Sequence, residues 1–338
     1  MAAAREFSNS INTFRAFFRT ESSGGVFLLI AALIALIAAN SPWSAGYLTF
    51  WHEYEAFINE GLMAIFFFLV GLEIRQEARS GQFRDPKSAA LPIIAAIGGM
   101  VTPALIFAIF NSGSATSNGW AIPMATDIAL ALGALALLGD RIDTSLKVFL
   151  LTLAIADDLG SILVLGIFYS DGVSLVKIAS SIGAVVLAWI IPLRGRFTTE
   201  KLIKIIHPWS AFIVIPLFAL ANIGIQIDVA NIDQMLSTPV VIGIVIGRVI
   251  GKVAGITFFA WAAVKLGIAK LPAALSFKEI AGAGALAGMG LTVSLFVAKI
   301  AFTNQSAIAD VKFALLVAAL ISGFLGIALL RKFSSKQD

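Results

Sequence analysis

Apolar residues along this chain fall into long runs that short polar segments separate. Ten of these runs reach the length of about 17–25 residues that a helix needs to cross a bilayer. They lie near residues 24–40, 56–74, 89–110, 119–138, 146–169, 175–193, 209–227, 239–264, 279–300 and 307–331. The pattern predicts an all-α polytopic membrane protein with ten transmembrane helices in a single domain, residues 1–338.

Residues 1–19 precede the first run and follow a different pattern. Four apolar side chains share one helical face and three arginines lie off it: Phe7, Ile11, Phe14 and Phe18, with Arg5, Arg15 and Arg19. This arrangement predicts an amphipathic helix on the membrane surface. Because more apolar runs follow the first, we interpret residues 24–40 as an uncleaved span and not as a signal peptide.

Lys and Arg residues are distributed unevenly between the two sides of the predicted membrane. Of the 24, nineteen fall in segments on one side and three on the other. Loops rich in Lys and Arg face the cytoplasm, so both termini are predicted to be cytoplasmic. The two remaining cations, Arg248 and Lys252, lie inside the eighth run.

Helix-breaking residues interrupt the fourth and ninth runs. The fourth carries Pro123 followed by the polar residues Thr126 and Asp127, and the ninth has four glycines between Gly282 and Gly290. Each glycine weakens a helix by about 1 kcal/mol relative to alanine. Non-helical backbone at membrane depth is tolerated only inside protein or beside water.

Each interrupted run is the middle of a group of three. The groups cover residues 89–169 and 239–331, and the predicted topology makes them inverted relative to each other. Paired breaks in two inverted halves point to the binding site of a secondary transporter. We therefore expect two inverted three-helix repeats, each with a discontinuous helix.

Five ionisable residues lie at membrane depth in these two groups: Asp127, Asp157, Asp158, Arg248 and Lys252. An ionised side chain at the bilayer centre costs roughly 2.5–3.5 kcal/mol on insertion scales, so function is the first interpretation and structural pairing of Asp with Lys is the alternative. Adjacent helical residues point about 100° apart. We expect one aspartate of the 157–158 pair to face a cavity and the other to face Lys252 or the broken spans.

The chemistry of this cluster suits cation exchange. Carboxylate oxygens are ligands for hard cations such as Na⁺, and interacting groups titrate as a unit. Competition of Na⁺ and protons for the oxygens of Asp157 and Asp158 would give exchange. We expect Asp127 and Lys252 to compensate the end charges of the broken helices, and Thr126 is a candidate uncharged ligand.

A ladder of glycines at four-residue spacing runs through the eighth span: Gly243, Gly247, Gly251 and Gly255. Small residues at this spacing predict close helix packing. Arg248 and Lys252 are also four residues apart and share a helical face. Close packing of this span would bring both cations near the broken helices.

Composition excludes several other classes of protein. The chain is 59% hydrophobic and only 13% charged, against about 25% charged in soluble domains. It has no cysteine and only two histidines, His52 and His207, so neither a thiolate site nor a multi-histidine metal site is expected. No Walker motif is present. We expect a transporter, not an enzyme, that binds no nucleic acid and no cofactor.

Several motifs resemble those of the NhaA-type Na⁺/H⁺ antiporter family, over nearly the whole chain. They are Ala-Ile-Pro-Met-Ala-Thr-Asp127-Ile-Ala, Ala-Ile-Ala-Asp157-Asp158-Leu-Gly, Phe-Phe-Phe-Leu-Val-Gly-Leu-Glu73, Ile-Gly-Lys252, His207-Pro-Trp and Gly-Met-Gly-Leu-Thr-Val-Ser294. The resemblance implies exchange of Na⁺ for protons across a bacterial inner membrane, with more protons than Na⁺ per cycle.

The resemblance also assigns roles to individual residues. Asp157 and Asp158 would carry Na⁺ and protons, and Lys252 would pair with Asp157 in the empty state. Asp127 and Thr126 would lie at the crossing of the broken helices. Three acidic residues match positions near the cytoplasmic funnel: Glu60, Glu73 and Glu77.

The chain also departs from the family pattern. Between Tyr169 and His207 it has one predicted span where the family pattern has three. The short segment from Ser41 to Glu55 lacks the β-hairpin through which family members dimerise, so the sequence leaves open whether this protein forms a homodimer. Arg248 is an intramembrane cation outside the family pattern and is a candidate for tuning the site.

Three functions follow from these observations, and experiments separate them. The leading hypothesis is an electrogenic Na⁺(Li⁺)/H⁺ antiporter that works by alternating access and serves pH and sodium homeostasis. A sodium-coupled symporter for an organic solute would show solute-dependent Na⁺ uptake without proton movement. A non-transporting relative that acts as a sensor or scaffold would bind Na⁺ without flux.

Overall fold

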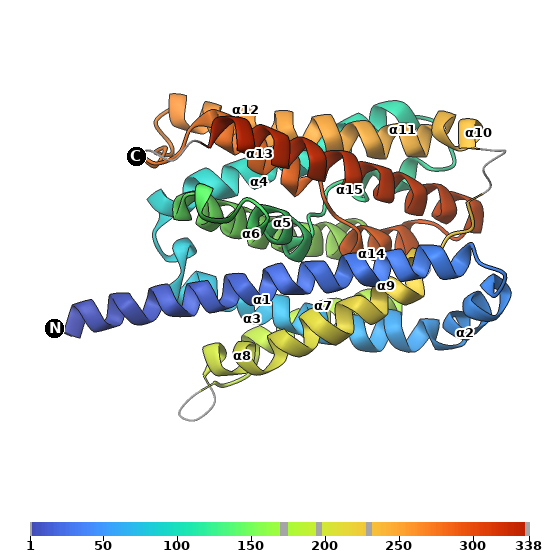
Figure 1. Ribbon diagram of the computed structural model, residues 1–338, viewed down its shortest axis with the longest axis horizontal. Helices are drawn as coiled ribbons and strands as arrows, with labels where there is room; N and C mark the ends of the chain where they lie inside the picture. Colours follow the sequence, from blue (N-terminus) through green and yellow to red (C-terminus); the bar gives the residue numbers. More distant parts are fainter. Residues whose placement is uncertain (1, 170–174, 194–197, 228–231, 335–338) are drawn as a thin grey trace.

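The computed structural model of the protein is built from helices (Figure 1). It describes the backbone of residues 2–169, 175–193, 198–227 and 232–334, and the side chains of these residues except 2–20, 140 and 175–179. This described part contains no strand. The helices run along one common direction, and both termini lie at the same end of the molecule (Figure 1).

Seven of the described helical segments are long and apolar enough to cross a membrane. They are Glu21–Ala39 of α1 (Ala2–Ala39), α2–η1–α3 (Ser44–Ala56, Phe57–Leu62 and Met63–Ser80), α4 (Pro86–Asn111), α6 (Thr144–Phe168), α8–η5–α9 (Thr199–Trp209, Ser210–Val214 and Ile215–Ile223), α11–η7–α12 (Pro239–Ile246, Gly247–Gly251 and Lys252–Lys265) and α15 (Gln305–Phe333). Here η1, η5 and η7 are π-helical turns.

The fourth and ninth predicted spans are both interrupted. The first consists of η3 (Ser117–Ala121) and α5 (Ile128–Ala136), and the second of α13 (Phe277–Ala287) and α14 (Thr292–Ala301), which are bent by 54°. The sixth predicted span corresponds to the shorter helix α7 (Leu175–Ile190). Helices thus occupy all ten predicted ranges, whereas the number of spans and the inverted repeats stay predictions. Short helices complete the described chain: η2 (Gln82–Arg84), η4 (Gly139–Arg141) and α10 (Ile232–Ser237).

Two predicted boundaries are wrong. Residues 2–39 form one helix, so no break separates residues 1–19 from the first span. The segment from Ser41 to Glu55 is mostly helical, because α2 begins at Ser44 and continues through η1 into α3. Residues 2–39 contain no proline, and Pro42 precedes the start of α2, so no proline within either helix removes a backbone donor. The predicted amphipathic face of residues 1–19 lies outside the described side chains.

The two predicted repeat groups meet where α4 packs against α12. A Cβ atom on Gly98 would overlap the carbonyl oxygen of Gly255, and one on Gly255 would overlap that of Gly98. Gly247 and Gly251 pack closely against Pro103 of α4: an added Cβ would lie 3.2 Å from its carbonyl oxygen and 3.3 Å from its Cα atom, respectively. Close packing along the glycine ladder is therefore confirmed.

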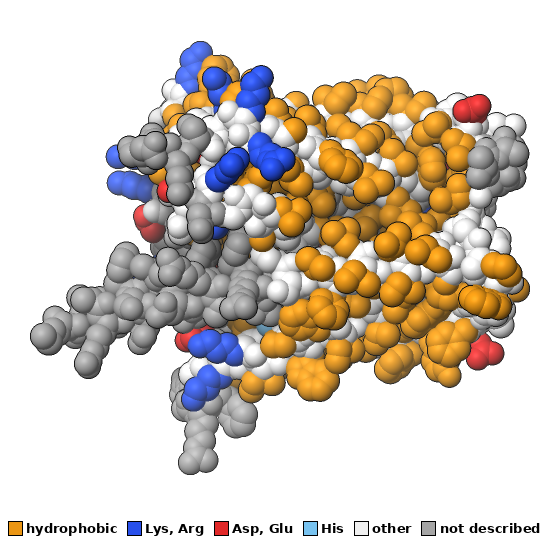
Figure 2. All heavy atoms as spheres, in the orientation of Figure 1, with side chains coloured by type: hydrophobic (Ala, Val, Ile, Leu, Met, Phe, Trp, Pro, Cys, Tyr) orange, Lys and Arg blue, Asp and Glu red, His pale blue; other side chains and the backbone are white. Residues whose placement is uncertain are grey.

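Charged side chains concentrate at the ends of the molecule, and the flank between them is apolar (Figure 2). Lys and Arg side chains gather at the end where both termini lie (Figure 2). One cation near this end is buried: Arg75 Nη1 donates to the carbonyl oxygens of Ala188 at 2.7 Å and Ile191 at 2.9 Å, which ties α3 to the last turn of α7. Lys299 forms an ion pair with Glu55 at 2.6 Å, which ties α14 to α2.

Candidate functional site

The two interrupted spans cross in direct contact in the interior of the protein. Their breaks are residues 122–127 and residues 288–291. The backbone N–H of Asp127 donates to the carbonyl oxygen of Met289 at 3.0 Å. Both breaks thus leave helix ends at one point, where unpaired N–H and C=O groups need partners.

Asp127 satisfies the N-terminal end of α14. Its Oδ2 atom accepts from the backbone N–H groups of Leu291 and Thr292 and from the Thr292 hydroxyl, each at 3.0 Å. A carboxylate at a helix N-terminus compensates the positive end of the helix dipole. The predicted compensation of a helix end by Asp127 is therefore confirmed.

Arg248 satisfies the carbonyl groups at the crossing. Its guanidinium is fully buried and donates to Ala125 O at 2.8 Å, Gly288 O at 3.0 Å and Ile122 O at 3.3 Å, and it also contacts the Ser294 hydroxyl. The direct hydrogen bonds to these carbonyl groups thus come from Arg248 and not from Lys252, the cation predicted to compensate a helix end. The planar fork of an arginine reaches several acceptors at once, which a lysine does not do.

Lys252 instead binds the aspartate pair. Its Nζ donates to Asp157 Oδ2 and to Thr126 Oγ1, both at 2.8 Å, and both ends of the ion pair are fully buried. The Thr126 hydroxyl in turn donates to the carbonyl oxygen of Ala287, the last residue of α13, at 2.9 Å. Lys252 thus joins α12, α6 and both breaks.

Asp157 and Asp158 point in different directions, as the helical geometry predicts. Asp157 faces Lys252, whereas Asp158 lines a cavity. The Oδ1 atoms of both aspartates are buried and have no hydrogen-bond partner among the described residues. An ionised carboxylate in this position is unstable without a compensating proton or cation, so the pair is suited to bind one.

The cavity reaches from the first break at the crossing to residues of α1, α3 and α8. Its polar lining comes from four helical segments and the first break: Glu21, Glu73, Thr126, Asp127, Asp158, His207 and Ser210. Of the three predicted funnel residues, only Glu73 lines it. Glu60 lies in η1, and Glu77 accepts from the backbone N–H of Gln82 at 2.6 Å at the end of α3.

Three polar lining residues were not among the predicted site residues: Glu21, His207 and Ser210. The sequence brought in His207 only through the His207-Pro-Trp motif, and its hydrogen-bond partner Glu21 lies 186 positions away. The available signal was a single acidic residue before the Gly24–Gly25 pair that opens the first apolar run.

Comparison with known proteins agrees with this geometry. A family model described as Na⁺/H⁺ antiporter 1 matches residues 15–195 and 177–330. The chain is similar to the Na⁺/H⁺ antiporter NhaA 1 of Flavobacterium johnsoniae, with 40% identity over 368 aligned positions that cover 94% of this chain and 96% of the relative. It is also similar to the Na⁺/H⁺ antiporter NhaA of Proteus mirabilis (41% identity, 85% and 88% covered) and of Vibrio cholerae (38%, 94% and 97%).

The lengths of these matches fit a shortened chain. The alignment with the Flavobacterium relative has 368 positions, more than the 338 residues of this chain, so the relative carries additional residues. The two matches to the family model overlap at residues 177–195, inside the segment where fewer spans are predicted than in the family pattern. The chain belongs to the Na⁺/H⁺ antiporter 1 family.

Proposed function

We propose that this protein exchanges Na⁺ or Li⁺ for protons at the helix crossing, with Asp157 and Asp158 as the groups that bind both. One observation carries the proposal: Asp158 lines the cavity with an unpaired carboxylate oxygen, while its neighbour Asp157 is held by Lys252. A cation that enters the cavity meets Asp158 first. It reaches Asp157 when Lys252 withdraws.

Charge balance makes the two substrates compete. Three carboxylates and two cations surround the crossing: Asp127, Asp157, Asp158, Arg248 and Lys252. With all five ionised their charge is −1, which either one Na⁺ or one proton neutralises. Binding of one substrate therefore favours release of the other, as in a coupled titration.

The residues at the crossing are of two kinds, those with fixed partners and those that can change partners. Asp127 and Arg248 are engaged with helix ends and hold the two breaks together. Asp157, Asp158 and Lys252 are the groups free to change partners during the cycle. Thr126 contacts Lys252 and offers a neutral oxygen at the same place.

The exchange is electrogenic if more protons than Na⁺ move in each cycle. Each net charge then couples to the membrane potential with about 2.3 kcal/mol per 100 mV. Alternating access requires a second conformation in which the aspartate pair is reached from the opposite side. The Lys- and Arg-rich end, where both termini lie, is the cytoplasmic end of a multi-pass protein in a bacterial inner membrane (Figure 2).

Dissipation of a pH gradient in everted membrane vesicles tests this function. Addition of NaCl or LiCl should release protons from vesicles that contain the protein, and Asp158→Asn should abolish the response. Asp310→Asn is a matched control, because Asp310 lies in α15 and does not line the cavity. No response from the folded parent protein at neutral or alkaline pH would refute exchange, and a full response from Asp158→Asn would refute the assigned site.

A further inference from the structure

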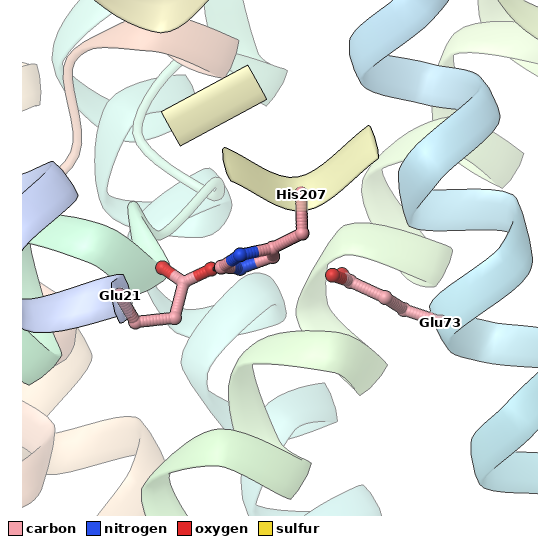
Figure 3. A group of neighbouring side chains, drawn as sticks. All are labelled: Glu21, Glu73 and His207. Atoms are coloured by element: carbon pink, nitrogen blue, oxygen red, sulfur yellow. The ribbon is translucent and has the colours of Figure 1, made fainter. Parts of the chain in front are cut away.

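Three side chains from three helices converge on the wall of the cavity, away from the crossing. Glu21 of α1, Glu73 of α3 and His207 of α8 each offer a ligand atom, and these atoms lie within 4.8 Å of one another. Glu21 Oε1 is hydrogen-bonded to His207 Nε2. The two carboxylates point toward the imidazole from opposite sides (Figure 3).

A second polar group lies beside this cluster without a partner. The hydroxyl of Ser210 is 1% exposed, has no hydrogen-bond partner among the described residues, and lines the same cavity. Ser210 follows His207 by three residues on the continuous α8–η5 helix, so both side chains lie on one face. A buried hydroxyl without a partner indicates room for a bound water or ion.

We propose that Glu21, Glu73 and His207 form a binding site for a divalent transition metal ion, with Zn²⁺ as the representative. Imidazole nitrogen and carboxylate oxygen are both Zn²⁺ ligands, and three protein ligands leave a fourth position open for water. The Ser210 hydroxyl is placed to hydrogen-bond that water. The imidazole favours transition metals over Mg²⁺ and Ca²⁺, which select oxygen ligands.

The charge balance of the site is complete. Two ionised carboxylates compensate the two charges of the metal ion, and a neutral imidazole supplies its lone pair. Metal binding replaces the hydrogen bond between Glu21 and His207, and any proton held there is released to solvent.

Binding at this position would inhibit transport. The metal would tie α1, α3 and α8 together and cancel the negative charge of two carboxylates in the cavity that leads to Asp158. The cavity would then attract Na⁺ less strongly, and relative motion of the three helices would be restricted. The inhibition rests on the proposed exchange function, whereas the binding step rests only on the geometry of the three ligands.

Zn²⁺ titration of the tag-free, full-length protein in detergent tests the binding step, with calorimetry as the readout. One Zn²⁺ per chain should bind, and Mg²⁺ should not compete. Since loss of a group that only supports a ligand weakens metal binding ~10–100-fold, His207→Gln should weaken it at least ~10-fold. His52→Gln is the matched control: it removes the other histidine, whose side chain is 82% exposed beside Glu55, and should bind Zn²⁺ like the parent.

Several outcomes would overturn the site. They are no binding by the parent protein, equal binding by parent and His207→Gln, or loss of binding in His52→Gln. Should His207→Gln fail to fold, Glu73→Gln decides by the same criterion. X-ray absorption of the Zn²⁺-loaded parent gives an independent answer, because a coordination shell without imidazole contradicts the proposed ligands.

The vesicle assay tests inhibition separately. Zn²⁺ should suppress the NaCl-induced response of the parent and of His52→Gln, and a ligand variant that still transports should be at least ~10-fold less sensitive. Zn²⁺ binding by a protein without exchange activity would support the site and refute the proposed function. Exchange without Zn²⁺ binding would refute the site and support the function.

Discussion

Replacing Arg248 by methionine tests whether this guanidinium holds the helix crossing together. Methionine keeps an apolar stem but leaves the carbonyl groups of Ala125 and Gly288 without their donor, whereas Ile122 O still accepts from Ser294 at 2.8 Å. A buried carbonyl without a partner costs about 1–3 kcal/mol, so two cost about 2–6 kcal/mol. Relief of the cost of burying a charge offsets part of this loss, and we expect a net destabilisation of about 2–4 kcal/mol.

Thermal unfolding in detergent measures this effect, through intrinsic tryptophan fluorescence or the loss of the monodisperse peak in size exclusion. Arg248→Met should unfold several degrees below the parent. Arg248→Lys separates charge from geometry, because it keeps the charge and loses the planar fork that reaches both breaks. We expect it to be destabilised as well.

The opposite pattern would refute this reasoning. If Arg248→Met unfolds within about 1 °C of the parent, the carbonyl groups at the crossing do not depend on the guanidinium. If Arg248→Lys behaves like the parent while Arg248→Met is destabilised, positive charge alone suffices and the fork geometry is irrelevant.

Two further predictions concern the scaffold. Gly98→Ala places a methyl group against the Gly255 carbonyl and should cost about 1–3 kcal/mol. Gly183→Ala on α7, where the added atom meets open space, serves as its control and should not lower the unfolding temperature. Asp85, the N-cap of α4, accepts from the Ser88 hydroxyl at 2.7 Å, and this bond together with the Lys87 N–H lowers the pKa of its carboxyl. A folded pKa below the unfolded value of about 3.9 gives stability that is present at neutral pH and lost as pH falls through the folded pKa. Asp85→Asn should therefore lose less stability on acidification than the parent. An equal loss in both proteins would contradict the stabilising role of the Asp85 carboxylate.

The helical ranges were predictable because long apolar runs indicate which segments lie in the membrane. The breaks were predictable too, since Pro123 and the glycines before Gly290 remove the local preference for helix. Hydropathy indicates which segments lie in the membrane, but it does not indicate whether a polar segment is helical. The hydropathy pattern therefore did not predict that α2 and the first residues of α1 continue the spans as helix. Those segments are polar enough to resemble loops, but nothing in them ends a helix.

The parts of the site that consist of contacts between charged side chains were predictable. The angle between Asp157 and Asp158 follows from helix geometry, and Lys252 was one of the two cations that the sequence places at membrane depth in the opposite repeat. The role of Arg248 could not be predicted, because most of its acceptors are backbone carbonyls that only the breaks make available. Glu21 was missed because its partner, His207, is distant in sequence and no local pattern connects the two.

The contact between Gly98 and Gly255 has a consequence for how the protein can move. Where two backbones touch, no layer of side chains remains that could change rotamers and let one helix slide along the other. Helices α4 and α12 are thus coupled as one rigid body, and the helices attached to them are carried along. The conformational change of a transport cycle therefore has to occur at boundaries other than the one between α4 and α12.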